Sequence, residues 1–324
     1  MISQYSKDFD EHTVVKVHAW GIDGEISLGC LFVNILDLFG PPTMHFMQQL
    51  ATFETSIETR NAMMDKSAFK KEQKRAAVTM ADVLLKYTAT AHPPLPALLA
   101  MIPVMKPRAY SIASAPDATP NYIELCVLID TFWCDEGMRY GLTCNMLRKK
   151  QGGDHVWCRI KAGSMDPPTA EQPVLCAGIG SGLAPHLSFL RNRVYQAENG
   201  MDVAPFSLFF GNRNRGEEFL YQSELEALET KYSWFKLHTA FSRDQAQKIY
   251  VQDLVARTDD ARLLLRENKQ GMLYICGNRN LPKPMQESLI KSFSKHSEDP
   301  GEIELAKSIM EDMFVHGRAQ QEVW

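Results

Sequence analysis

The chain has 324 residues, of which 45% are hydrophobic and 23% are charged, and its formal net charge is -4. This length predicts about two domains, and the composition is that of an ordinary globular protein. The negative charge argues against a nucleic-acid-binding protein and against a polybasic membrane anchor, and no apolar run approaches the roughly 18 residues that span a bilayer.

The N-terminal sequence, Met1 to Asp8, lacks the charged-then-apolar order of a secretory signal peptide. It is expected to be either an ordinary cytoplasmic start or an internal start within a longer protein, and an organelle stays open as the location. The seven cysteines form no C-x-x-C pair, so reduced thiols are expected, with neither a zinc site nor an iron–sulfur cluster.

The first third of the chain is predicted to change from strands to helices. Residues 12–40 fit a strand, a turn, and then a second strand or short helix. Residues 43–87 contain no proline and have helical spacing. The basic run Lys66–Arg75 is interpreted as a solvated helix face, and the alternative is a docking surface for an acidic electron-transfer partner.

A cluster of prolines between residues 93 and 107 precedes a β-rich part that is expected to be antiparallel. Arg108–Ala115 and Ile123–Ile129 are predicted strands, and Gly141–Lys149 is a predicted turn that continues into a helix. The Gly- and Pro-containing stretch from residue 163 to residue 173 predicts a linker.

From Pro173 onward strands and helices alternate, which predicts βαβ units and a parallel sheet. The predicted strands are Val174–Ala177, Phe206–Phe210, Phe235–Phe241 and Met272–Cys276. The predicted helices fall within residues 183–194, 223–231, 250–267, 284–294 and 303–315.

A glycine-rich loop follows the first of these strands. Gly178, Gly180 and Gly182 stand ahead of a helix opened by Pro185. Glycines let a backbone come close to a pyrophosphate, and a helix N-terminus offers unpaired N–H groups to it. The alternative is that the glycines only allow the chain to turn.

Two cations and a hydroxyl follow the third predicted strand, where open α/β sheets bind ligands. Ser242, Arg243 and Lys248 suit a 2′-phosphate, because charge-assisted hydrogen bonds to phosphate are strong. Tyr250 is suited to stack on an adenine ring. The alternative is a charged loop with an incidental tyrosine.

Two further segments suggest a redox site. In one, Arg108 could pair with a pyrophosphate, Tyr110 could lie against a flavin ring, and Ser111 could hydrogen-bond near its reactive nitrogen. In the other, Cys276 precedes Gly277 at a strand end, a position suited to contact a nicotinamide. The alternatives are a plain amphipathic strand and a buried structural thiol.

Taken in order, these segments resemble the reductase module of the NADPH–cytochrome P450 reductase and sulfite reductase flavoprotein family, within the ferredoxin–NADP reductase superfamily. The resemblance runs from about residue 30 to Trp324. The motifs that carry it are Arg108–Ser111, Glu124–Leu128, Gly141–Leu147, the Gly178 loop, Leu208–Arg213, Glu218–Leu225, the Ser242 cluster, Cys276 with Gly277, and Val323 with Trp324.

The resemblance implies an α/β fold with a β-rich part. Residues 1–165 would form a partial antiparallel FAD-binding barrel with a helical insertion at about residues 41–100. Residues 166–324 would form a parallel-sheet NADP-binding domain.

The resemblance also assigns roles to individual residues. Ser111, Cys276 and Glu322 correspond to the family's hydride-transfer trio, and Trp324 to the aromatic residue that shields the flavin and swings aside for nicotinamide. The remaining implied contacts to FAD are Arg108, Tyr110, Cys126, Leu128, Gly141, Thr143 and Cys144. The implied contacts to NADP(H) are Gly180, Ser181, Gly182, Arg213, Ser242, Arg243, Lys248, Tyr250 and Gln252.

The chain departs from the family pattern at several positions. Ser181 stands where Thr is commoner, His186 where Phe is frequent, Asn278 where Asp is usual, and Glu322 where an Asp is usual. The family's earlier barrel strands are missing upstream. We therefore expect either that another segment covers the open strand edges or that the chain is part of a larger polypeptide.

The implied activity is that of an FAD-dependent NADPH oxidoreductase, which passes electrons between NADPH and FAD and then to or from an FMN- or flavodoxin-like partner. The sequence is most similar to the C-terminal reductase part of pyruvate:NADP oxidoreductases at three places, Pro185–Leu190, Cys276–Pro284 and the last five residues. In those oxidoreductases, electrons would flow toward NADPH. Two alternatives are a free-standing diaphorase and a nucleotide-binding or regulatory relic with impaired FAD binding.

Overall fold

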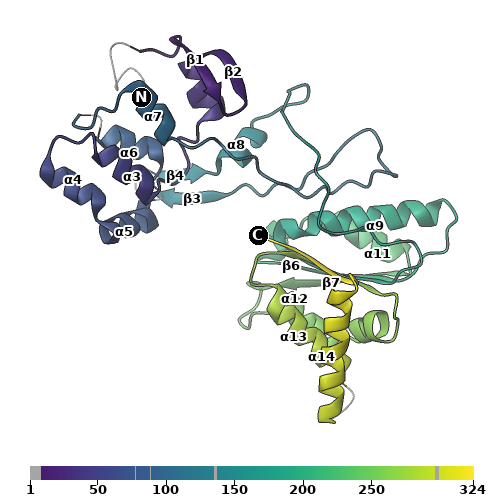
Figure 1. Ribbon diagram of the computed structural model, residues 1–324. Coiled ribbons are helices and arrows are strands. Elements are labelled where there is room, and N and C mark those ends of the chain that lie inside the picture. The colour runs from purple at the N-terminus through teal and green to yellow at the C-terminus, as the bar shows by residue number, and fades with distance from the viewer. Residues whose placement is uncertain (1–8, 77, 88, 135–136, 296–298) are drawn as a thin grey trace. The chain divides into compact units, whose positions relative to one another are not determined.

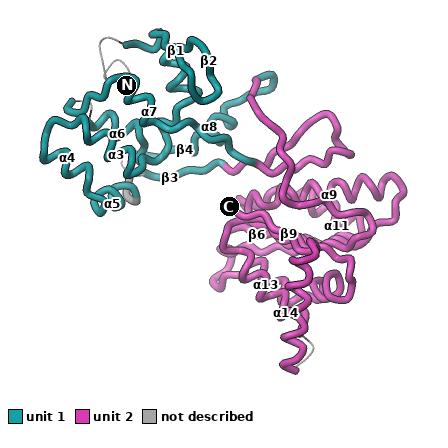
Figure 2. Tube along the Cα trace, in the orientation of Figure 1, with its two compact units in different colours: residues 1–109, 129–154 teal, residues 110–128, 155–324 magenta. Residues whose placement is uncertain are grey.

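A computed structural model of the chain describes residues 9–76, 78–87, 89–134, 137–295 and 299–324 (Figure 1). The expectations for the first eight residues lie outside the described part. The chain forms two compact units, residues 1–109 with 129–154 and residues 110–128 with 155–324 (Figure 2). No helix in the described part is long and apolar enough to cross a membrane.

The first unit begins with an antiparallel hairpin of β1 (Val14–Ala19) and β2 (Ile22–Ser27). Its turn residues Trp20 and Gly21 both have positive φ, 59° and 78°, as a tight two-residue hairpin turn requires. The predicted first strand is confirmed by β1, whereas β2 lies in residues that were expected to form the turn. The element expected after the turn, a strand or short helix, is helical. The short helix α2 (Leu28–Cys30) and the π-helical turn η1 (Leu31–Ile35) follow.

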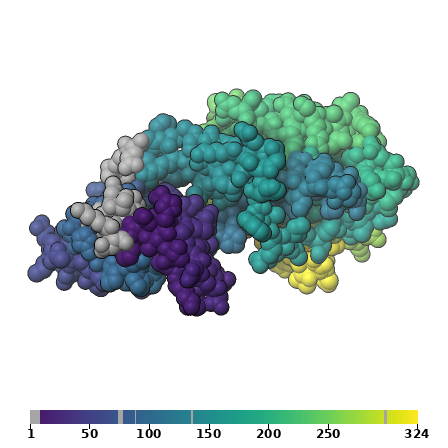
Figure 3. Space-filling view, turned by 90° about the horizontal axis from the view of Figure 1, so that it is seen from above, coloured from purple at the N-terminus to yellow at the C-terminus, as the bar shows by residue number. Residues whose placement is uncertain are grey.

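Helices dominate the rest of the described first unit. Four of them lie within residues 43–87, as the sequence predicts, and a further one follows at residues 95–101. Thr43 and Ser56 begin two of them as N-caps, each accepting a backbone N–H three residues ahead. Apolar side chains of the hairpin and of the helices share one buried cluster, and Figure 3 shows the two segments side by side. The helices are α3 (Met44–Ala51), α4 (Ile57–Met64), α5 (Lys66–Ala76), α6 (Met80–Tyr87) and α7 (Leu95–Met101).

A second antiparallel pair, β3 (Thr131–Cys134) and β4 (Gly137–Tyr140), leads into α8 (Leu142–Arg148). The guanidinium of Arg139 on β4 bonds both carboxylate oxygens of Asp82 on α6, at 2.8 and 3.1 Å. These bonds hold the pKa of Asp82 at about 2. The pair is thereby fixed to the helices of the same unit.

Two predicted strands are wrong in detail. Arg108–Ala115 and Ile123–Ile129 contain no regular strand, and one isolated bridge joins Ile112 to Leu125. A strand requires a continuous ladder of paired backbone groups. Here side chains of α9 (Leu183–Glu198) take up carbonyl groups of the first segment instead.

The second unit is built on a five-stranded parallel sheet with strand order β7-β6-β5-β8-β9. Four strands were predicted, because strands buried on both faces read as continuous apolar runs. The fifth, with the polar sequence Ala-Gln-Gln-Glu-Val at the sheet edge, was not predicted. The strands are β5 (Val174–Ile179), β6 (Phe206–Asn212), β7 (Phe235–Phe241), β8 (Met272–Gly277) and β9 (Ala319–Val323).

Helices cover both faces of this sheet (Figure 1). Alternate side chains of β5 enter opposite cores, Cys176 on the side of α9 and α11, and Leu175 on the side of α12, α13 and α14. Besides α9, the helical elements described in the second unit are η2 (Gly180–Gly182), α10 (Arg215–Glu218), α11 (Gln222–Lys231), α12 (Val251–Arg257), η3 (Arg262–Arg266), α13 (Pro282–Phe293) and α14 (Pro300–Val315).

A buried arginine on α9 fixes the predicted linker to the sheet layer. Arg193 is 1% exposed, and its guanidinium donates to the carbonyl oxygens of Thr169 (2.8 Å), Gln172 (3.0 Å) and Ala204 (2.7 Å). Burial lowers the pKa of Arg193 to about 10, so the side chain stays charged at neutral pH. Three carbonyl partners compensate for its loss of water.

The buried His186 gives a prediction about acid stability. Burial lowers its pKa from 6.5 to about 4, although Nε2 lies 3.2 Å from the carbonyl of Ala177. Between these values the unfolded chain binds a proton that the folded chain does not, so stability falls as the pH decreases. His186→Phe should reduce the loss of unfolding free energy between pH 7 and pH 4 by about 3 kcal/mol.

Urea denaturation of the full chain at pH 7 and at pH 4 measures this difference in unfolding free energy. The control is His155→Phe, because His155 is exposed in the same unit and should leave the pH dependence unchanged. An unchanged pH dependence in His186→Phe would contradict the prediction.

Candidate functional site

The strand order reverses at β5, since β6 and β7 are added on one side and β8 and β9 on the other. The carboxyl ends of β5 and β8 are therefore the switch point at which open α/β sheets bind ligands. The glycine-rich loop follows β5 at this point, and Cys276 and Gly277 end β8. The sequence motifs at residues 178–182 and 276–277 thus lie on adjacent strands.

The glycine-rich loop has the geometry of an anion site. Gly180 has a φ of +56°, and nothing lies within 4 Å of the position that a Cβ would take. A Cβ on Gly182 would lie 2.3 Å from the carbonyl oxygen of Cys276, so glycine is required for this turn to pack on β8. The N–H of Leu183, the first residue of the 16-residue helix α9, bonds the carbonyl of Gly180 within η2. Because helix N-termini bind anions, this turn is a candidate site for a pyrophosphate.

Ser111, Cys276 and Glu322 come together in the second unit. Parallel pairing of β8 with β9 places Glu322 opposite Cys276, and Oγ of Ser111 donates to Oε2 of Glu322 at 3.2 Å. Cys276 is fully buried. Burial, and after it the charge of Glu322, raises the pKa of the Cys276 thiol to about 12. The thiol is therefore neutral at physiological pH and unsuited to nucleophilic attack.

Trp324 directly follows β9. Its N–H donates to the carbonyl of Gly277 at 3.1 Å, and its carbonyl accepts the N–H of Arg279 at 3.0 Å. The side chain is 52% exposed. The backbone is thus held at the same edge as Cys276, and the indole is left half uncovered.

The predicted phosphate-binding cations lie after β6 and β7. The N–H of Arg243 donates to the carbonyl of Arg213 at 2.8 Å, so the two chain segments are adjacent. The guanidinium of Arg213 is already paired with Glu218. The side chains of Arg243 and Lys248 are exposed and have no ion pair within the described part of the chain. These two cations are the ones free to meet a phosphate.

Three more predicted contacts lie near these cations. The N–H of Ser242 donates to the carbonyl of Asn212 at 3.0 Å. Tyr250 begins α12 with its ring 44% exposed, and Gln252 is half-buried in the first turn of that helix.

Three of the predicted FAD contacts of the first unit lie at the start of α8, and the fourth is Arg108. The N–H of Gly141 donates to the carbonyl of Asp130 at 2.9 Å, and the buried Cys144 thiol donates to the carbonyl of Gly141 at 3.2 Å. Thr143 is half-buried in the same turn. Arg108 is exposed, and its guanidinium donates to the carbonyl of Lys106 at 2.6 Å.

The other predicted FAD contacts belong to the second unit. Tyr110 is half-buried, and Leu128 is 60% exposed. Cys126 packs against the apolar cluster around α9, and burial, followed by the charge of Glu124, raises the pKa of its thiol.

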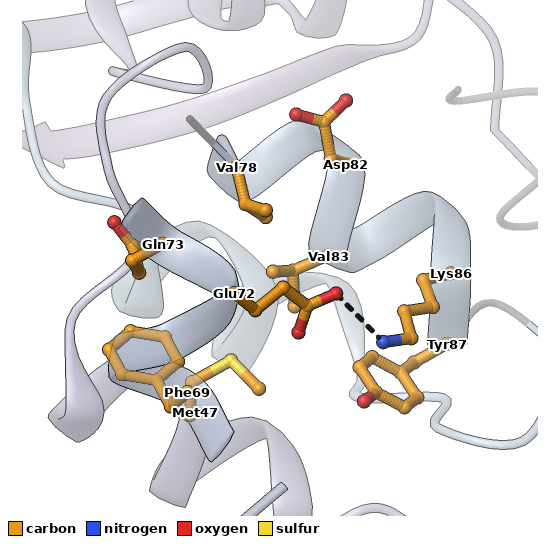
Figure 4. A pocket seen from close by; sticks show the side chains of 9 residues that line it. All are labelled: Met47, Phe69, Glu72, Gln73, Val78, Asp82, Val83, Lys86 and Tyr87. Carbon is orange, nitrogen blue, oxygen red and sulfur yellow. Dashed lines mark hydrogen bonds and ion pairs between the residues drawn. The ribbon is translucent and has the colours of Figure 1, made fainter. Parts of the chain in front are cut away.

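None of these residues lines the small pocket of the first unit that Figure 4 shows. Its polar groups already have partners, because Nζ of Lys86 pairs with Glu72 at 3.3 Å and Asp82 is bound by Arg139. No group of three or more His, Cys, Asp or Glu in the described part could hold a metal ion. The pocket is lined by Met47, Phe69, Glu72, Gln73, Val78, Asp82, Val83, Lys86 and Tyr87.

Sequence reasoning missed the residues that hold the Ser111 segment in place. Arg191 on α9 bonds the carbonyl of Ala113 and the carboxylates of Glu124 and Glu224. The one signal for it is a charged residue beside the apolar stripe of a helix, which is also typical of a solvated side chain.

The close approach of Gly182 to β8 is testable. Gly182→Ala places a methyl group against the backbone of Cys276, which cannot yield as a side chain can. The substitution should lower the free energy of unfolding by about 1–3 kcal/mol, as measured by urea denaturation. Gly216→Ala is the control, since its Cβ would meet nothing within 4 Å. Equal stability of Gly182→Ala and the unsubstituted chain would contradict this packing.

Comparison with known proteins identifies two domain types. Residues 1–146 match a family model described as an FAD binding domain, and residues 175–287 match one described as an oxidoreductase NAD-binding domain. The chain is 36% identical over 304 residues to mitochondrial pyruvate dehydrogenase (NADP+) of Euglena gracilis. The aligned region covers 92% of this chain and 17% of that protein.

Two further relatives cover similar parts of the chain. A probable sulfite reductase (NADPH) flavoprotein component of Schizosaccharomyces pombe is 32% identical over 312 residues, 92% of this chain and 30% of that protein. The inducible nitric oxide synthase of Mus musculus is 29% identical over 306 residues, 91% of this chain and 26% of that protein. The chain thus spans less than a third of the length of each of these three relatives.

Proposed function

The chain belongs to the diflavin reductase family and carries its FAD-binding and NAD-binding domains, and from this premise we propose that it transfers hydride between NADPH and FAD. The observation that carries the proposal is the meeting of Ser111, Glu322 and Cys276 at the switch point of the parallel sheet. This edge adjoins the glycine-rich turn, so a nucleotide held there would reach the three residues.

NADP(H) would be held along the carboxyl edge of the sheet. Gly180, Ser181 and Gly182 would bind its pyrophosphate through backbone N–H groups and the start of α9. Arg243 and Lys248 would bind the 2′-phosphate, because neither pairs with a carboxylate among the residues that the structure describes. The adenosine part of the nucleotide would contact Arg213, Ser242, Tyr250 and Gln252.

FAD, when bound, supplies the flavin ring that exchanges hydride with the nicotinamide. The residues proposed to hold it are Arg108, Tyr110, Ser111, Cys126, Leu128, Gly141, Thr143 and Cys144. The two small antiparallel sheets are proposed to be parts of a barrel, with the helices of residues 41–100 as its insertion and a domain boundary after residue 165.

The chain's own groups would order the two rings. The carboxylate of Glu322 accepts a hydrogen bond from the Ser111 hydroxyl and places negative charge beside Cys276. This charge would favour the positively charged nicotinamide. The neutral thiol of Cys276 would contact that ring without attacking it. The indole of Trp324 would cover the flavin and move aside before nicotinamide enters, which makes its motion a gate for turnover.

We further propose an FMN- or flavodoxin-like domain or protein as the electron partner. Membership of the diflavin reductase family supports such a partner. Similarity to a pyruvate dehydrogenase (NADP+) supports electron flow toward NADPH. The cytoplasm is the proposed location, although the Euglena relative is named as mitochondrial.

The 2′-phosphate site is tested by nucleotide preference. Lys248→Ala and Arg243→Ala should each weaken NADP+ binding by roughly 10- to 100-fold, the size of a lost charge-assisted hydrogen bond, and leave NAD+ binding unchanged. Calorimetric titration with each nucleotide measures both affinities.

Lys231→Ala is the matched control, because this lysine pairs with Glu198 on the surface of the same unit. It should change neither affinity. Equal weakening of NADP+ and NAD+ by Lys248→Ala would remove Lys248 from the 2′-phosphate site.

A further inference from the structure

The segment that carries Ser111 lacks the support that strands normally give. Residues 110–115 contain no regular strand, and their backbone pairs with residues 123–128 at one isolated bridge, in which the N–H of Ala113 donates to the carbonyl of Glu124 at 2.8 Å. The hydroxyl of Ser114 also accepts the N–H of Glu124, at 3.0 Å. Ser111 reaches Glu322 through a single side-chain bond. Other groups must therefore fix the position of this serine.

One of these groups is Arg191 on α9. Its Nη1 donates to the carbonyl of Ala113 at 2.9 Å and to Oε2 of Glu124 at 3.1 Å. Its Nε and Nη2 donate to the two carboxylate oxygens of Glu224 at 2.7 and 2.8 Å. The side chain is 19% exposed. Every nitrogen of the guanidinium is thus engaged, and one of them bonds the backbone two residues from Ser111.

The geometry of these bonds gives the arginine a positioning role. A bidentate pair with Glu224 fixes the plane of the guanidinium, so the remaining nitrogen points in one direction, toward Ala113 and Glu124. One turn earlier on the same helix, Oγ of Ser188 donates to the carbonyl of Ser114 at 2.8 Å. Two successive carbonyls of the segment are therefore bound by side chains of α9.

We propose that Arg191 is a positioning residue for hydride transfer, which sets Ser111 against Glu322 and Cys276 by binding Ala113 and Glu124. The consequence for the rate rests on the proposed function. Because α9 begins at the glycine-rich turn, one rigid helix would join the pyrophosphate site to the serine that meets the flavin. A ladder of strand hydrogen bonds would hold such a segment without any side chain, and it is absent here within the described residues.

The first test is hydrogen–deuterium exchange of the full chain with Arg191→Met. Peptides covering residues 110–128 should exchange faster than in the unsubstituted chain, because the bond to Ala113 and the tie to Glu124 are lost. Arg266→Met is the matched control, since Arg266 is similarly buried in the same unit and bonds the carbonyl of Phe293 and the carboxylate of Glu302. It should leave residues 110–128 unchanged. Unchanged exchange of this segment in Arg191→Met would overturn the proposal.

The second test is a double-mutant cycle with Ser111→Ala, measured as the rate of flavin reduction by NADPH in the FAD-loaded chain. Arg191→Met should slow the reaction on the order of tenfold to a hundredfold, the size expected when a reacting group is misplaced. It should add little in the Ser111→Ala background, because it acts through that serine. Multiplicative effects of the two substitutions would overturn the proposal, and Arg266→Met should not change the rate.

Arg191→Lys keeps the test decisive if Arg191→Met does not fold. Lysine retains the charge, but a single ammonium group cannot reproduce the fork that spans a carbonyl and two carboxylates. Its effects should have the same direction and be smaller, and full activity with unchanged exchange would overturn the proposal. An unsubstituted chain that binds FAD but is not reduced by NADPH would instead refute the proposed function, and the exchange experiment alone would then decide whether Arg191 holds the segment.

Discussion

The parallel pairing of β8 with both β5 and β9 is the interaction on which the candidate site depends. Backbone hydrogen bonds in a parallel sheet fix register, so Gly178 of β5 and Glu322 of β9 are set on either side of Cys276. The absence of a side chain on Gly182 lets the glycine-rich turn pack against the end of β8. Three segments that lie far apart in sequence thus meet at one sheet edge, where the strand order reverses.

Buried charged groups with complete hydrogen bonding attach the irregular segments to this sheet. Arg193 binds the carbonyls of the linker, and Arg191 binds the Ser111 segment. At the opposite end of the strands, Asp260 accepts bonds from Ser207, Lys236 and His238. Although burial alone would raise its pKa, these bonds hold the pKa of Asp260 at about 2. Each group is costly to bury and specific once satisfied, so loss of one partner leaves an uncompensated charge.

Sequence reasoning succeeds where one local pattern determines the structure. The buried strands β5 and β8, the first strand of the first unit and the glycine-rich turn are all visible as local patterns of apolar residues and glycines. It fails where a distant partner decides. β9 is polar, and it becomes a strand through pairing with β8. Residues 108–115 have a strand-like composition, but their carbonyls are bound by a helix. From the sequence, Arg213 was expected to contact the nucleotide, whereas in the structure its guanidinium forms an ion pair with Glu218. The contact between Ser111 and Glu322, 211 residues apart, was expected from family resemblance and not from any local pattern.

The measurement that tests the central claim most directly is the visible absorbance spectrum of the purified chain, recorded before and after anaerobic addition of NADPH. A chain that holds FAD beside the nicotinamide site should show flavin bands that bleach with NADPH, and the same concentration of NADH should bleach them more slowly. A chain that stays colourless after FAD is supplied, or bound flavin that NADPH does not bleach, would contradict the account.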